Sequence, residues 1–428
     1  MKKRINIHLW RSLGRLIALF TFSPVFATSV ETDCPWYLAG EAMTLSITAG
    51  NAIIAYAELC DTHSLAAGVA ISIDGTRGTG IIQLPSDLHS GYYVLSVYTR
   101  DNANVSRRLV AVINPLRRSE ADDIEWVAIT HPDSLSYAES VSVAGSFEEN
   151  SVREPDPLDI RETEGHVIKA RIRNVHDGRT YKREQIRPAL SIVGKQIHYF
   201  EGKMVNDTTA VFYTFGLHGR LPLVLSATTS SGEGLPIEVL SPYAALIPQQ
   251  LPHLVFHYKR SEVEARSLDM QRHKKRRQQA SSGTSADQGP VPVILDYDDT
   301  LFDTTPDISY NLDEYRQFLT VREVLIEYVE GVRSKRKDGR LRLFVRNKDG
   351  YDSQWPAMVL IDGMPVNDVE RLLNYDARRL HYINIYGSQY TFGNGVYNGI
   401  LSFITRSGQL TNYPTEPNMQ YLVYDFPE

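Results

Sequence analysis

The stretch that most constrains the fold of this chain lies near its C-terminus, at residues 358–408. Its first apolar run, MVLI, leads into Asp362 and Gly363, a pair that favours a tight turn because both residues tolerate a left-handed backbone. A short helix-like piece and a β-rich segment follow, and then come a loop rich in Gly and Asn at 387–398 and an apolar strand at 399–405. No residue in this stretch stands in the pattern of a nucleophile or a metal ligand. We therefore expect it to fold and dock rather than to catalyse a reaction.

Composition narrows the class of protein. The chain of 428 residues is long enough for about two to four domains. With 42% hydrophobic and 22% charged residues it has the make-up of a globular protein rather than a disordered one. Its net charge of −6 gives no reason to expect a nucleic-acid partner, and its 24 tyrosines favour strands over helices.

The N-terminus predicts export. Residues 1–15 carry five basic side chains and no acidic one, residues 16–22 are apolar, and Val25-Phe26-Ala27 offers small residues to a signal peptidase. This pattern predicts a signal peptide at residues 1–27 and therefore an exported mature chain, in the periplasm if nothing else directs it further. The apolar run is shorter than the roughly 20 residues of a membrane-spanning helix, so we do not expect it to span the membrane. The alternative to a cleaved signal peptide is an uncleaved amphipathic anchor.

Export gives the two cysteines, Cys34 and Cys60, two alternatives. An oxidising compartment would permit a disulfide that closes a loop of about 25 residues and contributes roughly 3 kcal/mol. Two unpaired buried thiols are the other outcome, since the sequence does not supply the distance between their Cα atoms.

Short alternating strands separated by Gly, Asn, Asp and Pro predict a mainly β multidomain chain with two antiparallel β-sandwiches. We place the first at residues 28–113 and the second at 158–258, joined by a polar connector at 114–157 that lies over the surface. Within the second, residues 221–228 form an apolar run typical of a strand covered on both faces. The first sandwich carries YLAGE at 37–41, AYAEL at 55–59, QLP at 83–85, SGYY at 90–93 and VYTR at 97–100. This series resembles the macroglobulin-type β-sandwich of bacterial envelope proteins.

A basic, low-complexity segment at residues 259–304 follows the second sandwich. It contains the run RHKKRR at 272–277, from Arg272 to Arg277, and then a tail rich in Gln, Ser, Gly and Ala. We expect a solvated linker. The alternative is a basic arm that contacts anionic lipid head groups.

The segment also contains the sharpest catalytic pattern, Asp296-x-Asp298 at the end of an apolar run. It is similar to the first motif of haloacid-dehalogenase-type phosphatases, which implies Asp296 as nucleophile, Asp298 as general acid/base and a magnesium ion between them. Such a fold needs a long α/β body downstream, and the roughly 125 residues that follow lack the alternating strand and helix pattern of a parallel sheet. We keep a magnesium-dependent phosphatase as the alternative function.

Residues 305–410 predict a small α+β domain, and residues 411–428 a tail. Thr320 and Glu323 have the spacing of a helix capping box, with apolar residues on one face up to Tyr328.

Several strings in this region, VLIDGMPVND at 359–368, YTFG at 390–393, NGIL at 398–401 and ITRSG at 404–408, resemble the plug domain of TonB-dependent outer-membrane receptors. About 20 residues follow them, too few for the receptor barrel, so the chain is not expected to be a self-contained transporter. The resemblance implies a non-catalytic envelope protein of a Gram-negative bacterium, without cofactor or metal, that binds a protein partner or ligand at the outer membrane. The binding residues it suggests lie in two loops: Asp362, Gly363, Pro365, Asn367, Asp368, Tyr390, Gly393 and Asn394.

Overall fold

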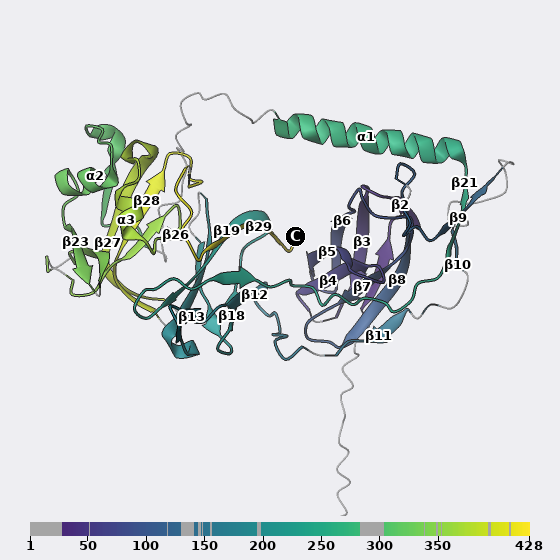
Figure 1. Cartoon of the computed structure of the whole chain (residues 1–428), viewed down its shortest axis with the longest axis horizontal. Helices are drawn as coiled ribbons and strands as arrows, with labels where there is room; N and C mark the ends of the chain where they lie inside the picture. The colour runs from purple at the N-terminus through teal and green to yellow at the C-terminus, as the bar shows by residue number, and fades with distance from the viewer. Residues whose placement is uncertain are drawn as a thin grey trace, which may run out of the picture.

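The computed structural model confirms a mainly β, multidomain chain whose units lie in a row (Figure 1). The predicted signal peptide lies outside the described residues. The structure describes residues 28–428 except 51, 118, 130–140, 144–146, 148, 155, 195–197, 283–303, 338, 348–349, 352, 393–394 and 411.

The first unit is a sandwich of two mainly antiparallel sheets. Its strands alternate buried and exposed side chains where one face meets solvent, as at Ala42–Thr48, so the two inner faces close a core around Leu45, Leu59 and Tyr93. One sheet has the order β1 (Ser29–Thr32), β3 (Ala42–Thr48), β6 (Arg77–Gln83). The other has the order β11 (Asn150–Val152), β8 (Asn104–Ile113), β7 (Gly91–Tyr98), β4 (Ile54–Cys60), β5 (Leu65–Ser72), with β2 (Trp36–Leu38) parallel to β8.

The expected connector and the end of the expected second sandwich form a small sheet of their own. Its order is β10 (Val141–Val143), β21 (Leu254–Tyr258), β9 (Ile124–Ala128), with β21 and β9 parallel. The prediction that residues 254–258 belong to the second sandwich is therefore wrong. Phe256 instead packs beside Trp36 of the first unit, with ring centroids 5.0 Å apart, so the chain returns to the first unit before it continues.

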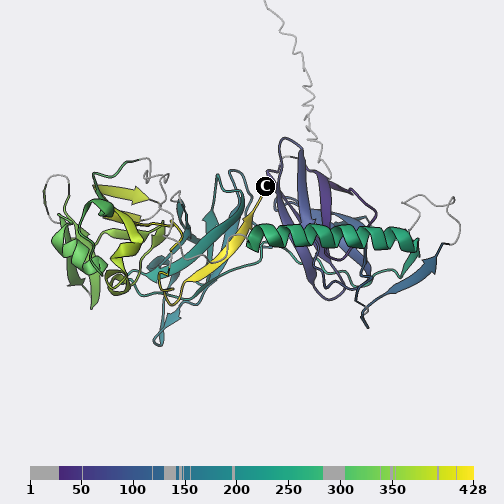
Figure 2. The ribbon, with the colours of Figure 1, turned by 90° about the horizontal axis from the view of Figure 1, so that it is seen from above.

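The prediction of a solvated linker at 259–304 is also wrong for its first part, because residues Arg260–Ser282 form helix α1. Val263 and Met270 lie on the helix face that packs on the core around Trp36. Arg266 stacks over the Trp36 ring at 4.3 Å and its Nε donates to Glu41 at 2.7 Å. Figure 2 shows α1 lying along the first sandwich. The basic run dominates the composition of this segment and hides the apolar positions that dock the helix.

The second unit is the other sandwich, and its last strand comes from the C-terminus of the chain. Residues 411–428 were expected to be a tail, but β29 (Gln420–Phe426) pairs with β19 (Gly219–Thr229) from Gly219–Phe426 to Leu225–Gln420. Tyr424 and Phe426 complete the core of this sandwich. One sheet has the order β17 (Lys203–Met204), β18 (Thr209–Tyr213), β12 (Val167–Ile172), β20 (Ile237–Val239). The other has the order β16 (His198–Glu201), β15 (Ile186–Ile192), β19, β29, and the 3-10 turn η2 (Arg183–Gln185) and the hairpin of β13 (Val175–His176) and β14 (Arg179–Thr180) lie outside both.

The third unit, residues 304–410, is the expected α+β unit. The capping box of Thr320 and Glu323 starts helix α2 (Val321–Glu327) as predicted. Asp362 and Gly363, with φ of 46° and 84°, make the predicted tight turn between β25 (Met358–Ile361) and β26 (Met364–Pro365). The sheet has the order β22 (Ile308–Asn311), β27 (Leu380–Phe392), β28 (Gly395–Thr405), β25, β26, and is accompanied by α3 (Val369–Leu373), the 3-10 turns η3 (Leu312–Glu314) and η4 (Ala377–Arg379), and the hairpin of β23 (Val332–Lys337) and β24 (Arg340–Val345).

The third unit and the second sandwich share apolar contacts. Residues 223–227 of β19 are buried throughout, because Leu223 and Leu225 face the sandwich core while Val224 belongs to the core of the third unit. On the opposite face of the sheet of the third unit, Tyr199 of β16 packs against the cluster that contains Tyr386. The predicted apolar strand at 221–228 is thus covered on both faces at residues 223–227, by two different units, while Pro222 is exposed.

A buried polar network joins the two sandwiches. The carboxylate of Glu162 accepts from Tyr56 at 2.7 Å, from Arg100 at 2.9 Å and from the backbone N–H of Val167 at 2.8 Å. The His166 ring lies between this carboxylate and Tyr424 on β29. Nδ1 of His166 is 3.1 Å from the carboxylate, and Nε2 of His166 is 2.7 Å from the Tyr424 hydroxyl. Residues of both sandwiches therefore meet at one carboxylate, and the C-terminal strand joins them through His166.

Protonation states in this network follow from burial and charge. Burial alone would raise the pKa of Glu162, but the hydrogen bond from His166 and the charge of Arg100 outweigh it and hold that pKa below its usual range. Burial lowers the pKa of His166, against the attraction of the Glu162 carboxylate. The network thus contains an ionised Glu162 and a neutral His166, whose Nδ1–H donates to the carboxylate and whose Nε2 accepts from Tyr424.

The first prediction concerns β29. Phe426 is 3% exposed in the core of the second sandwich, so Phe426→Ala should lower the free energy of unfolding by about 3–5 kcal/mol. Val423 lies on the same strand with 57% exposure, and Val423→Ala should change it by less than about 0.5 kcal/mol. Urea unfolding followed by circular dichroism measures both; equal effects would show that β29 is not part of the core.

The second prediction concerns pH. The pKa of His166 is lowered in the folded chain, so the unfolded state, in which that pKa is 6.5, binds the proton first as the pH is lowered. The free energy of unfolding therefore decreases as the pH falls below about 6.5. The lowered pKa of Glu162 adds a loss in the same direction at more acidic pH. Between pH 7.5 and 5.5, His166→Gln should make the slope of unfolding free energy against pH shallower by up to about 1.4 kcal/mol per unit. Parallel slopes for the two proteins in urea unfolding would contradict the assignment of a neutral buried His166.

Candidate functional site

The turn at Asp362 and Gly363 is a buried structural element and not an exposed binding loop. The carboxylate of Asp362, 1% exposed, accepts from the backbone N–H of Thr405 at 2.7 Å, from the Thr405 hydroxyl at 2.5 Å and from the N–H of Leu410 at 2.8 Å. Burial raises the pKa of Asp362, and the hydrogen bonds from Thr405 and Leu410 oppose that rise. Asp362 therefore ties the β25–β26 turn to the end of β28.

The residues that follow the turn are also held by the fold. Pro365 is half-buried in β26, where it pairs with Leu360. The backbone N–H groups of Asn367 and Asp368 donate to the buried carboxylate of Glu416 at 3.0 and 3.1 Å. The Asp368 side chain caps α3 by accepting from the N–H of Arg371 at 3.2 Å. These residues shape the turn before α3. Asn367 and Asp368 also line an open pocket together with Glu370, Glu416 and Asn418.

The second predicted loop, 387–398, is largely a β-hairpin. β27 and β28 pair from Gln389–Asn398 to Phe392–Gly395, after a register shift between Tyr386 and Gln389. Tyr390 is half-buried and packs with Tyr199 and Tyr397. Gly393 and Asn394 lie outside the described residues.

The fold separates the two predicted loops. β25 runs parallel to β28 in the register Met358–Ile400 to Ile361–Phe403, so the Asp362 turn lies at the Thr405 end of β28. The hairpin tip lies at the other end of the same strand, beyond Gly395. At about 3.3 Å per residue along β28, the two are roughly 30 Å apart. They cannot form one site.

The other sequence predictions have mixed outcomes. Cys34 and Cys60 are free thiols, one half-buried and one buried, so the structure contains no disulfide between them. The segment with Asp296 and Asp298 lies outside the described residues, so the phosphatase hypothesis stays a prediction. Arg272 is exposed on α1, while the side chains of residues 273–277 lie outside the described part, and lipid contact also stays a prediction. Over the described residues no group of three or more His, Cys, Asp or Glu is placed to hold a metal ion.

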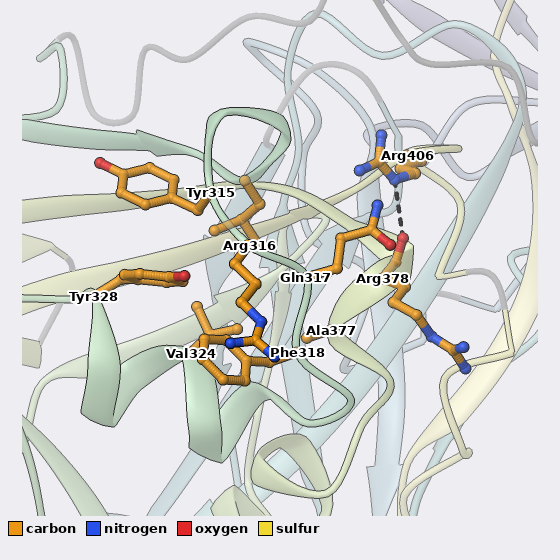
Figure 3. Close-up of a pocket in the computed structure, with 10 residues that line it drawn as sticks. Tyr315, Arg316, Gln317, Phe318, Val324, Tyr328, Ala377, Arg378 and Arg406 are labelled. Carbon is orange, nitrogen blue, oxygen red and sulfur yellow. Dashed lines mark hydrogen bonds between the residues drawn. The ribbon is translucent and has the colours of Figure 1, made fainter.

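A pocket that the sequence did not reveal lies beside α2 in the third unit (Figure 3). Tyr315 and Tyr328 lie on one side of it and Arg378 and Arg406 on the other. The Tyr328 ring contacts both Tyr315, with centroids 4.7 Å apart, and Phe318, with centroids 5.3 Å apart. The pocket is therefore lined by aromatic rings and by guanidinium groups.

Two of the guanidinium groups at the pocket are fixed by acids. Arg378 makes two hydrogen bonds to Asp376, at 2.8 and 2.9 Å, and Arg406 pairs with Asp313 while its Nε donates to the carbonyl of Arg378 at 2.9 Å. The hydrogen bond from Arg406 holds the pKa of Asp313 below its ordinary value. These pairs brace the pocket wall.

Exposed apolar side chains also occur on α2 and in the segment that precedes it. Leu319 is 62% exposed, Ile326 on α2 is 75% exposed and Tyr315 is 36% exposed. We call Tyr315, Arg316, Phe318, Leu319, Ile326 and Tyr328 together the α2 patch. In the sequence, Ile326 breaks the amphipathic pattern of α2, because it lies on the side opposite Val321, Val324 and Leu325. That out-of-phase apolar residue was the available signal for this surface.

Comparison with known proteins places the chain in no family. No family model and no curated protein matches the sequence. Solved structures that resemble it include the BSP domain of a biofilm-associated protein, with a TM-score of 0.17, 10% identity, and 54% of this chain and 30% of that chain covered. They also include Escherichia coli alpha-2-macroglobulin activated by porcine elastase, with a TM-score of 0.19, 11% identity and coverages of 50% and 19%. Fibronectin(III)-like modules of Clostridium thermocellum CbhA give a TM-score of 0.14, 9% identity and coverages of 53% and 93%.

The chain spans less than a third of the first two of these structures, and scores at this level support no statement about its function. Within the described residues, no helix has the length and apolar character needed to cross a membrane.

The third prediction tests the structural role of Asp362. Asp362→Ala removes the acceptor of two backbone N–H groups at a buried site, so the free energy of unfolding should fall by about 3 kcal/mol. Glu370 of α3, half exposed and paired with Arg322 at 3.0 Å, is the matched control, and Glu370→Ala should cost about 0–1 kcal/mol. Chemical unfolding distinguishes them, and a neutral Asp362→Ala would restore the view of this turn as a binding loop.

Proposed function

We propose that this chain is an exported envelope protein whose third unit docks onto a protein partner at the outer membrane. The observation that carries the proposal is the exposure of large apolar side chains in the α2 patch, where Leu319 is 62% and Ile326 is 75% exposed. The predicted signal peptide and the resemblance of residues 358–408 to a receptor plug support the location and the docking role.

The chemistry of the α2 patch favours a protein partner. Exposed apolar patches on soluble proteins often mark interaction sites. Aromatic residues and Arg are enriched in the cores of protein interfaces, where they supply most of the binding energy. Tyr315, Phe318 and Tyr328 provide the rings, and Arg316 provides an exposed guanidinium next to them.

The patch is presented on a braced surface. The Thr320–Glu323 capping box fixes the start of α2, and Val321, Val324 and Leu325 anchor its inner face in the core of the third unit. A preorganised surface binds with a smaller loss of conformational entropy than a mobile one.

The fourth prediction tests this docking surface. A photo-crosslinking amino acid at position 326 of the exported chain should form an adduct with a protein of the producing cell's outer-membrane fraction. Ile81 on β6 of the first sandwich is 60% exposed and gives the matched control position. Ile326→Asp should weaken capture of the same partner by about 30-fold, the effect of losing an interface residue worth about 2 kcal/mol.

Equal adducts at positions 326 and 81, or none at position 326, would contradict the proposal. Ile81→Asp should leave capture unchanged, which separates loss of the docking surface from a general loss of solubility.

A further inference from the structure

A second cleft in the third unit lies between the loop that joins β24 to β25 and the β27–β28 hairpin. It opens at the end of the sheet opposite the Asp362 turn. We infer that this cleft binds a neutral saccharide. The inference does not depend on the docking role of the α2 patch, since Tyr315 to Tyr328 take no part in the cleft.

The floor of the cleft is built by a β-bulge. Tyr386 pairs with Ile400 and Gln389 with Asn398, so Gly387 and Ser388 lie opposite the single residue Gly399. Gly399 has φ of 87°, and a Cβ there would lie 2.8 Å from Cβ of Val345. Glycine at this position therefore lets β24 approach the bulge, and the bulge directs Ser388 into the cleft.

The bulge is fixed from below. The N–H of Gly387 donates to the carboxylate of Asp307 at 2.6 Å. On the hairpin wall, the amide of Gln389 donates to Oδ1 of Asn398 at 3.1 Å. Each carboxamide has two donors and an acceptor with two lone pairs, so both keep capacity to bind a ligand.

The opposite wall holds an exposed indole. Trp355 is 61% exposed, and Lys337 lies over its ring at 4.4 Å while its Nζ donates to the carbonyl of Gln354 at 3.3 Å. The Ser353 hydroxyl donates to the backbone carbonyl of Trp355 at 2.8 Å and accepts from the backbone N–H of Trp355 at 3.1 Å. These bonds hold a large apolar ring in solvent at the cleft edge, where it completes no core.

The lining has the chemistry that an uncharged polyol requires. The cleft has a volume of about 580 Å³, within the roughly 300–1,000 Å³ of pockets that hold small ligands. Among the described residues that line it, none is charged, and amides and hydroxyls dominate. Such groups match the mixed donors and acceptors of sugar hydroxyls, and an indole face packs against the apolar C–H face of a sugar ring.

The fifth prediction is tested with a glycan array that carries neutral and acidic oligosaccharides, probed with the exported chain, followed by calorimetry with the best neutral oligosaccharide. The wild-type chain should bind neutral glycans in preference to acidic ones. Trp355→Ala should weaken the affinity about tenfold or more, because it removes the stacking face. Gln389→Ala should weaken it as well, through the lost hydrogen bonds.

Trp126 on β9, 36% exposed, is the matched control, and Trp126→Ala should bind as the wild type does. Binding to no neutral glycan, a preference for acidic glycans, or unchanged affinity in Trp355→Ala would overturn the inference. Ile326→Asp should retain saccharide binding, so a failure of the docking proposal would be seen separately.

Discussion

The organisation of this protein depends on the buried carboxylate of Glu162. It binds the guanidinium of Arg100 and the hydroxyl of Tyr56 from the first sandwich. Through His166 it also reaches Tyr424 of the C-terminal strand. A buried charge is tolerated when its hydrogen bonds are satisfied. The loss of one partner leaves a buried charge without compensation, which destabilises the folded state. One ionised group thereby makes the two sandwiches and the end of the chain structurally interdependent.

The pairing of β29 with β19 connects the end of the chain, and with it this network, to the rest of the molecule. Residues 420–426 complete the sheet that also contains β15, β16 and β19. The whole segment between β20 and β29 is therefore an insertion in the sequence of the second sandwich. That segment includes α1 and the entire third unit. Val224 contributes to the core of the third unit and Tyr199 packs on its sheet, so this unit is attached by packing as well as by chain connections. The α2 patch and the saccharide cleft are thus carried on one continuous scaffold.

The sequence predicted the features that short-range chemistry determines. Thr320 and Glu323 make their capping box, and Asp362 and Gly363 make their turn. The strand predicted at 221–228 is buried on both faces at residues 223–227, where two units enclose it. What it missed depends on contacts between distant residues. No local pattern shows that residues 420–426 pair with 219–225 or that Val263 docks on the core around Trp36.

The candidate site was missed for the same reason. Turn propensity identified Asp362 correctly but could not show that its carboxylate is enclosed by Thr405 and Leu410. Trp355 lies in a loop without a recognisable motif. Its place at the cleft depends on the bulge at Gly387 and Ser388, which is more than 30 residues away in the sequence.

Buried contacts join the first sandwich to the second through Glu162, and the second sandwich to the third unit through Val224 and Tyr199, so the three units should keep a fixed arrangement. Spin labels on noncanonical residues at positions 81 and 326, both exposed on the outermost units, measure it through the dipolar distance between them. A single narrow distance distribution that broadens in Glu162→Ala is the expected result. A broad or multimodal distribution in the wild-type chain would contradict the account.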